Sequence, residues 1–190
     1  MVLSTSFTGE DSLDIALDAG NAGGAGYAEF DGDSTALDSL QVDGVSYTFP
    51  VGGATMIVGD NTDGSALFTT ACVYGGPSNT LDDCGNVNAG ITNGGAMVGA
   101  AYDFDNGFTA AVGYAGPEGA ILTEESLDAY GINAAYTGDS YGLSLTYGLI
   151  ESSTTEEDTY TAFNGYYTPE GLPSISVGYE TGDILSLIHI

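Results

Sequence analysis

Two cysteines are the most reactive side chains of this sequence, and their spacing limits what they can do. Cys72 and Cys84 lie twelve positions apart in a stretch rich in Gly, Asn, Asp and Pro. The stretch has neither a CxxC redox motif nor the four nitrogen or sulfur ligands of a structural zinc site. A disulfide that closes a loop in an oxidising compartment is therefore favoured over a metal site.

The other reactive residue types form no recognisable catalytic arrangement. The only histidine is His189, so no cysteine or serine has a base to activate it. Asp and Glu total 27, too many for one pair to stand out as a general acid and base. Residues 31–33 and 60–64 faintly resemble calcium loops but lack the spaced ligands of a calcium motif, and turn formation explains them better. We predict a protein that is not an enzyme and has no cofactor or metal site.

The charge is entirely of one sign. The chain has no Lys or Arg and a net charge of −27. Nucleic acid is excluded as a partner, and an ATP site is disfavoured, because no basic residue could meet the phosphates. Such a surface suits a salty medium with divalent cations, and a solvated acidic surface accounts for most of these charges.

Strands must carry most of this chain. Its 190 residues include thirty glycines, thirteen tyrosines and seven phenylalanines, which favour strands and turns over helices. No apolar run approaches the ~18 residues of a membrane helix. If the protein lies in a bilayer, it must cross as a β-barrel.

Apolar and polar residues alternate with period two in ten segments, which pair into five hairpins. The paired segments are residues 3–7 with 13–17, 45–49 with 54–58, 98–104 with 108–114, 130–136 with 141–149, and 163–167 with 175–179. The turn Asp105-Asn106-Gly107 gives the strongest of the hairpin signals.

Connections between the hairpins are longer than the turns within them. They are predicted at residues 19–39, 60–95, 116–125 and 152–158. Outer-membrane barrels alternate short and long connections in this way, whereas a β-sandwich has no reason to do so. We therefore predict an antiparallel up-and-down transmembrane β-barrel in which residues 60–95 fold inward as a constriction.

The polar face of each strand would be the lumen. It carries the predicted pore-lining residues Asp14, Asp18, Asp103, Asn133, Ser144, Thr146 and Glu180. Carboxylates there would favour cations, although some of these residues could instead lie at strand ends and have no selective effect. On these faces, Arg is expected to be costly at the lipid-facing Leu145 and tolerated at the lumen-facing Ser144.

Aromatic residues cluster near strand ends. Tyr102, Phe104 and Phe108 flank one tight turn, and Tyr136 and Tyr141 flank another. Aromatic girdles of a membrane barrel have this placement, and so do ordinary cross-strand pairs of a soluble sheet.

Several short segments resemble one family. They are TSFTGED at 5–11, LDAGN at 17–21, YTFP at 47–50, PSISVGY at 173–179, and ACVYGGP with DDCGN at 71–77 and 82–86. These segments resemble the barrel of cyanobacterial outer-membrane porins, which are related to the carbohydrate-selective porins and include iron-uptake porins. The resemblance covers most of residues 1–184 and is greatest to acidic members from marine picocyanobacteria.

The resemblance implies a larger assembly in the cell outer membrane. Ten strands would be part of a sixteen-stranded barrel, forming a homotrimer at full length and preceded by a signal peptide, a surface-layer-homology domain and a coiled coil. Basic relatives carry Lys and Arg where this chain has Asp14 and Asp18, so an anion preference does not carry over. Residues 185–190 read like a translated sequencing adapter, and we expect the barrel fragment to comprise residues 1–184.

Two functions fit these observations. The first is a porin for passive diffusion of small hydrophilic solutes or ions, such as sugars or metal ions, with outer-membrane lipid around it and an acidic lumen that favours cations. The alternative is a secreted acidic β-protein that acts as an adhesin or a calcium-dependent binding module. The porin would need detergent to leave the membrane, whereas the adhesin would stay soluble in salt.

Overall fold

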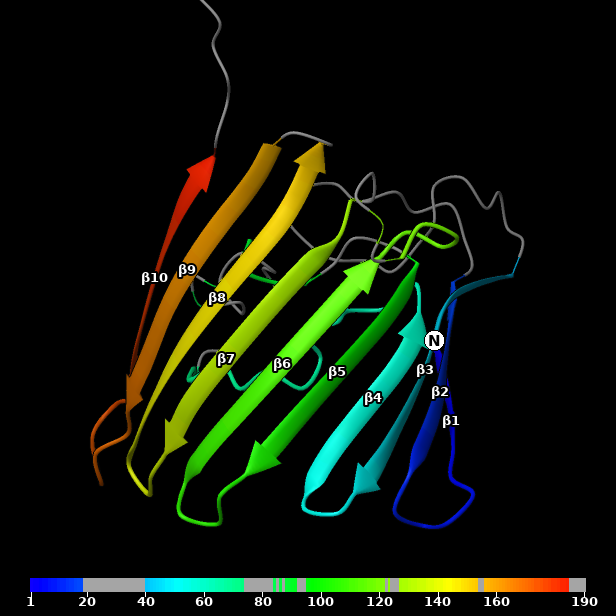
Figure 1. Ribbon diagram of the computed structural model, residues 1–190. Coiled ribbons are helices and arrows are strands. Elements are labelled where there is room, and N and C mark those ends of the chain that lie inside the picture. Colours follow the sequence, from blue (N-terminus) through cyan, green and yellow to red (C-terminus); the bar gives the residue numbers. More distant parts are fainter. Residues whose placement is uncertain are drawn as a thin grey trace, which may run out of the picture.

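A single antiparallel sheet contains all the strands of this computed structural model (Figure 1). The structure describes residues 1–18, 40–73, 84, 86, 88–91, 95–121, 123, 127–153 and 156–184. The strands are β1 (Val2–Thr5), β2 (Ser12–Asp18), β3 (Gln41–Val51), β4 (Ala54–Asp60), β5 (Ala96–Asp103), β6 (Phe108–Gly116), β7 (Ala129–Thr137), β8 (Tyr141–Ser153), β9 (Glu156–Tyr167) and β10 (Ile175–Ile184).

Each strand pairs with its neighbours in chain order, so the topology is up-and-down. The period-two sequence pattern thus correctly predicts an all-β, ten-stranded antiparallel sheet. In the described part of the chain, no helix is long and apolar enough to span a membrane.

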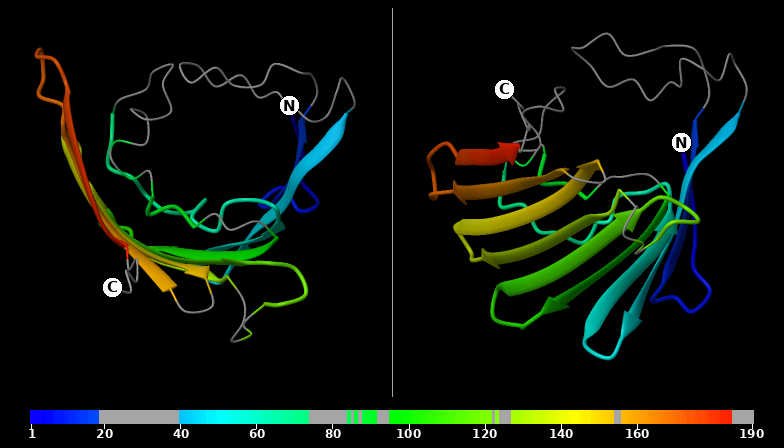
Figure 2. Two further views of the ribbon diagram at one scale, coloured as in Figure 1. Left: turned by 90° about the horizontal axis from the view of Figure 1, so that it is seen from above. Right: turned by 45° about the horizontal axis from the view of Figure 1, so that its top comes forward.

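The sheet is strongly curved and open. Seen from above it forms an arc (Figure 2, left). The edge strands β1 and β10 each pair with one neighbour and not with each other, so the described residues do not close into a barrel.

One predicted connection is wrong. Residues 152–158 were expected to form a long loop, but β8 continues to Ser153 and β9 begins at Glu156. Glu151 pairs with Glu157 across these strands. The alternation of apolar residues ends near Ile150, but the hydrogen-bonded pairing of β8 and β9 continues through polar residues. A prediction based on apolar alternation therefore ends these strands too early. The connections that follow β2, β4 and β6 remain longer than the turns at the opposite end.

The two faces of the sheet differ in exposure. In β7 and β8, Asn133, Ser144 and Thr146 are 4%, 2% and 0% exposed, whereas the neighbouring Ile132 and Leu145 are 58% and 52% exposed. Asn133 and Ser144 bind Thr69 and Ala71 of the segment that follows β4, and this segment lies inside the arc of the sheet (Figure 2, left). The buried residues are therefore on the concave face, which we call the inner face; the other is the outer face. Polar residues are therefore covered and large apolar residues are bare, which is the reverse of a water-soluble sheet.

The described residues of the connection between β4 and β5 cover the inner face; we call them the inserted loop. They are residues 61–73, 84, 86, 88–91 and 95. Ile91 of the loop is fully buried in a cluster with Ile57, Met97, Ala115 and Ala129. The apolar core lies between the inner face and this loop.

A row of glycines makes room for the inserted loop. Gly99, Gly113, Gly131 and Gly148 pair in sequence across β5 to β8. A Cβ atom at Gly131 would lie 2.5 Å from Cγ1 of Ile91, and one at Gly113 would overlap the carbonyl oxygen of Gly64. The loop backbone can approach the sheet because these positions have no side chain.

Candidate functional site

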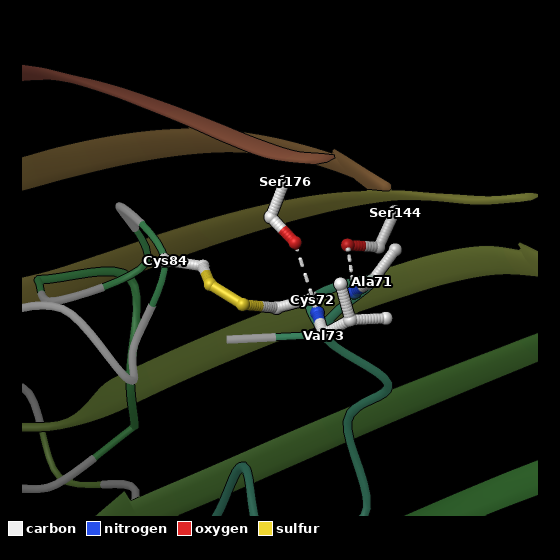
Figure 3. Close-up of a disulfide and its surroundings, with 6 residues drawn as sticks. All are labelled: Ala71, Cys72, Val73, Cys84, Ser144 and Ser176. Carbon is white, nitrogen blue, oxygen red and sulfur yellow. Dashed lines mark hydrogen bonds between the residues drawn. A yellow bond between two sulfur atoms is a disulfide. The ribbon is translucent and has the colours of Figure 1, made fainter. Parts of the chain in front are cut away.

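Polar side chains of the inner face bind the backbone of the inserted loop. Thr69 N–H donates to Asn133 Oδ1 (2.9 Å), and Asn133 Nδ2 donates to the Thr69 carbonyl (3.1 Å). Ala71 N–H donates to Ser144 Oγ (2.9 Å), and Val73 N–H donates to Ser176 Oγ (3.0 Å) (Figure 3). These bonds satisfy loop amides that would otherwise be desolvated against the sheet.

A carboxylate holds the far end of the loop. Glu180 in β10 accepts hydrogen bonds from Asn88 N–H (2.9 Å), Asn88 Nδ2 (3.0 Å) and Ala89 N–H (2.7 Å). Hydrogen bonds to a charged acceptor are stronger than neutral ones, at about 1.5–3 kcal/mol each. Glu180 therefore holds the loop against β10, the strand of the sheet that is farthest from β4, where the loop begins.

The predicted disulfide is present. Cys72 and Cys84 are bonded, with their Cα atoms 6.2 Å apart (Figure 3). The carbonyl oxygen of Cys84 occupies the place where a Cβ atom of Gly178 would lie. The disulfide thus joins Cys84, which lies against Gly178 of β10, to the segment that Ser144 and Ser176 bind.

The calcium-like segment at residues 60–64 behaves as a turn. Asp63 Oδ1 accepts hydrogen bonds from Ser65 N–H (2.7 Å) and Ser65 Oγ (2.6 Å), and Asn61 has a positive φ of 52°. These contacts are those of a turn, and residues 31–33 lie outside the described residues. Nowhere in the described chain do three or more His, Cys, Asp or Glu residues gather to hold a metal ion.

The predicted pore-lining residues fall into three groups. Asn133, Ser144, Thr146 and Glu180 lie on the inner face beneath or against the inserted loop. Asp14 is level with Ser46 and Gly59 on the inner face, away from the Asn133 and Ser144 contacts, and it accepts a hydrogen bond from Ser12 Oγ (2.9 Å).

The remaining two acidic residues lie near strand ends. Asp103 is exposed at the turn between β5 and β6, where its Oδ1 accepts from Asp105 N–H (2.9 Å). Asp18 is half-buried at the end of β2, beyond the register shift after Ala16. A water-filled lumen beside any of these seven residues stays a prediction.

One expectation about the inner face is corrected. Arg at Ser144 was expected to be tolerated as a residue facing an open lumen. Ser144 is covered by the inserted loop and accepts the Ala71 amide, so an Arg side chain there would displace the loop. Sequence reasoning also missed Ser176 and the glycine row, because strand alternation gives the face of a residue but not what covers it.

Large apolar side chains are exposed on the outer face from β5 to β10. The exposed side chains that we call the apolar belt are Val98, Phe108, Val112, Ile132, Leu143, Leu145, Phe163 and Val177. The aromatic pairs Tyr102–Phe104, Phe108–Tyr136 and Tyr136–Tyr141, with ring centroids 4.9, 4.8 and 5.4 Å apart, flank the belt at the tight turns. Tyr114 and Tyr130 pair at the opposite end of β6 and β7, with centroids 5.3 Å apart.

The turn between β1 and β2 is organised by one carboxylate. Asp11 accepts from Ser6 Oγ (2.6 Å), Thr8 N–H (2.8 Å) and Tyr47 OH (2.6 Å). The Ser6 hydroxyl, followed by the Tyr47 hydroxyl and the Thr8 amide, holds the pKa of Asp11 well below its usual range.

No protein-family model matches the chain, and no curated protein matches it significantly. The geometry of its two faces is therefore the basis of the functional argument.

Proposed function

We propose that this chain forms part of the wall of an outer-membrane channel of the porin type. Small hydrophilic solutes or ions would diffuse through it passively, with cations favoured. The observation that carries the proposal is the reversed polarity of the sheet: the apolar belt is exposed, whereas Asn133, Ser144 and Thr146 are buried. Hydrocarbon is the solvent in which such an outer face is stable.

Strand lengths support a membrane location. β6 to β10 contain 9, 9, 13, 12 and 10 residues. A tilted strand needs about 9–11 residues to cross a bilayer. The aromatic pairs at both ends of the belt fit the interfaces, where amphipathic rings are enriched.

Closure of the barrel would need further strands. An open sheet edge in hydrocarbon leaves unpaired N–H and C=O groups, each of which costs several kcal/mol. β1 and β10 both present such edges. Additional strands that pair with these two would complete the wall, as the resemblance to sixteen-stranded porins implies.

The inserted loop would narrow the channel. It lies inside the arc of the sheet, fixed by Asn133, Ser144, Ser176 and Glu180. With no Lys or Arg in the sequence, the walls contributed by this chain carry only negative formal charge. Such a constriction would select small solutes and favour cations.

Fractionation of the expressing cells separates the channel from the adhesin. We expect the protein in the outer-membrane fraction, resistant to extraction with salt or urea and released by detergent, because the apolar belt needs lipid or detergent around it. Recovery of folded protein from the soluble fraction in detergent-free salt would overturn the proposal.

A further inference from the structure

An apolar groove interrupts the outer face near the end that bears the long connections. Its cavity volume is about 510 Å³, within the ~300–1,000 Å³ of small-molecule sites. Tyr130, Ile132, Tyr147 and Leu149 form its walls. Tyr130 pairs with Leu149 and Ile132 pairs with Tyr147, so the four side chains form two adjacent rows on β7 and β8.

Two carboxylates stand at one end of this groove. Glu151 and Glu157 line it and face each other across the β8–β9 ladder. Glu151 Oε2 accepts from Asp128 N–H (3.1 Å), and the buried Asp128 accepts from Tyr130 OH (3.2 Å). Like charges opposite each other destabilise a sheet, and a cation between them would relieve that repulsion.

The two halves of the groove select one class of ligand. An alkyl chain fits the row formed by Ile132 and Tyr147, and the aromatic ring of Tyr130, in the next row toward Glu151, can attract a cationic head. The adjacent Glu151 and Glu157 complement the same positive charge. An anionic head would meet only negative charge, because the chain has no Lys or Arg.

Other occupants fit less well. A second copy of this chain would bring further carboxylates to the rim, since its net charge is −27. A bare metal ion would use the carboxylates but would leave the apolar walls uncovered.

We infer that the groove binds a membrane lipid with an ammonium head group, whose alkyl chain lies along β7 and β8 and whose head lies between the Tyr130 ring and the carboxylates of Glu151 and Glu157. This inference rests on the proposed membrane location of the outer face. It adds a lipid site to a channel wall that has no other assigned ligand.

Lipid-selective fluorescence quenching tests the inference, because the chain has no tryptophan of its own. One reporter is Thr161→Trp, on the outer face of β9 opposite Tyr147 and outside the set of groove-lining residues. The matched control is Leu143→Trp, on the outer face of β8 toward the tight turns. Each full-length variant is placed in vesicles that contain either a brominated trimethylammonium lipid or a brominated neutral glycolipid with the same chains.

We expect the cationic lipid to be favoured over the glycolipid about two- to fivefold more at Thr161→Trp than at Leu143→Trp, as one exposed charge pair predicts. Adding Glu151→Gln and Glu157→Gln should reduce the preference at Thr161→Trp toward that of the control, because only the contact with the Tyr130 ring then remains. Glutamine at position 151 keeps an oxygen that can accept the hydrogen bond from the Asp128 N–H group. Quenching of the tryptophan by either brominated lipid shows that the substituted protein is still embedded in the membrane.

Two outcomes would overturn the inference in different ways. Equal preferences at both reporters, or a preference that the glutamine substitutions leave unchanged, would refute the groove site while leaving the membrane location intact. No quenching of either tryptophan by any brominated lipid would refute the membrane location and the lipid site together.

Discussion

Single glycines determine how closely the inserted loop approaches the sheet. Gly99, Gly113, Gly131 and Gly148 form one row, and atoms of Gly64, Ala89 and Ile91 occupy the space above it. Glycine normally weakens a strand, so a row of four in paired positions has a stability cost of its own. The contacts with the loop offset that cost.

We predict that Gly131→Ala destabilises the protein by about 1–3 kcal/mol, because the new methyl group overlaps Ile91 and forces the loop to shift. Urea unfolding in detergent micelles measures the free energy. The control is Ala134→Val, which adds two carbons on the exposed outer face of the same strand and should change the free energy by less than about 0.5 kcal/mol. Equal effects of the two substitutions would contradict the close packing of the loop.

A second prediction concerns Asp11 and pH. The pKa of Asp11 is lowered in the folded state by the Ser6 and Tyr47 hydroxyls and the Thr8 amide, and in an unfolded chain it is near 3.9. Ionised Asp11 therefore stabilises the fold fully above about pH 4, and this contribution is lost as pH falls from there toward the folded-state pKa. Asp11→Asn should reduce the free energy of unfolding at pH 7 and have progressively less effect below about pH 4.

The control for Asp11 is its neighbour. Glu10 is exposed, so Glu10→Gln should leave the free energy of unfolding at pH 7 nearly unchanged. A constant difference between wild type and Asp11→Asn from pH 7 down to pH 2 would show that the substitution acts through shape and not through charge.

At the scale of elements, the two-residue period predicts the strands and their faces well. Ten strands appear where alternation predicts them, because side chains of a strand alternate between faces wherever one face is covered. The same rule fails beyond Ile150, where the ladder of β8 and β9 continues through polar residues. What covers each face is not encoded in local alternation: Ala71 meets Ser144 and Val73 meets Ser176 across 73 and 103 residues of sequence.

The apolar belt gives a prediction about faces. Leu145→Arg should cost about 2–4 kcal/mol in lipid vesicles, because it places a charge on the outer face near the middle of β8. Ser46→Arg should cost less, since Ser46 lies on the inner face opposite Asp14, whose carboxylate can pair with the new guanidinium. Equal costs would mean that the outer face does not meet lipid.

The disulfide gives a prediction about the inserted loop. Intact mass under non-reducing conditions should be lower by two hydrogens than that of the fully reduced chain, and two free thiols would contradict the Cys72–Cys84 bond. Cys72→Ala with Cys84→Ala should cost about 2–4 kcal/mol, because closing a short ring restricts the unfolded chain. In planar bilayers the double variant should show larger or noisier conductance if the loop forms the constriction.

At the scale of the whole molecule, the inserted loop links strands that are far apart in the sheet. It begins after β4, and its Ile91 packs in the core with Ile57 and Met97. Its Ala89 binds Glu180 of β10, at one edge of the sheet. Composition predicts the acidic character of this assembly and the hairpins predict its sheet order. The curvature of the sheet and the contacts that hold the loop could not be predicted, because both depend on glycines and polar residues that local patterns do not distinguish.

The last prediction concerns the selectivity of the assembled channel. Asp14 and Glu180 lie on the inner face, Asp103 lies at its rim, and the chain has no Lys or Arg to compensate them. Their potential should attract cations, and it should weaken with salt because the screening length falls from about 10 Å at 0.1 M to about 3 Å at 1 M.

The reversal potential of the full-length channel across a potassium chloride gradient measures this preference. We expect cation selectivity at 0.1 M that declines toward 1 M, and a smaller preference in Asp14→Asn, whose carboxylate takes no part in holding the loop. Asp183→Asn, at an exposed position on the outer face of β10, is the matched control and should leave the reversal potential unchanged. Anion selectivity at low salt would refute the cation preference, because it would require basic residues outside these 190 to dominate the pore.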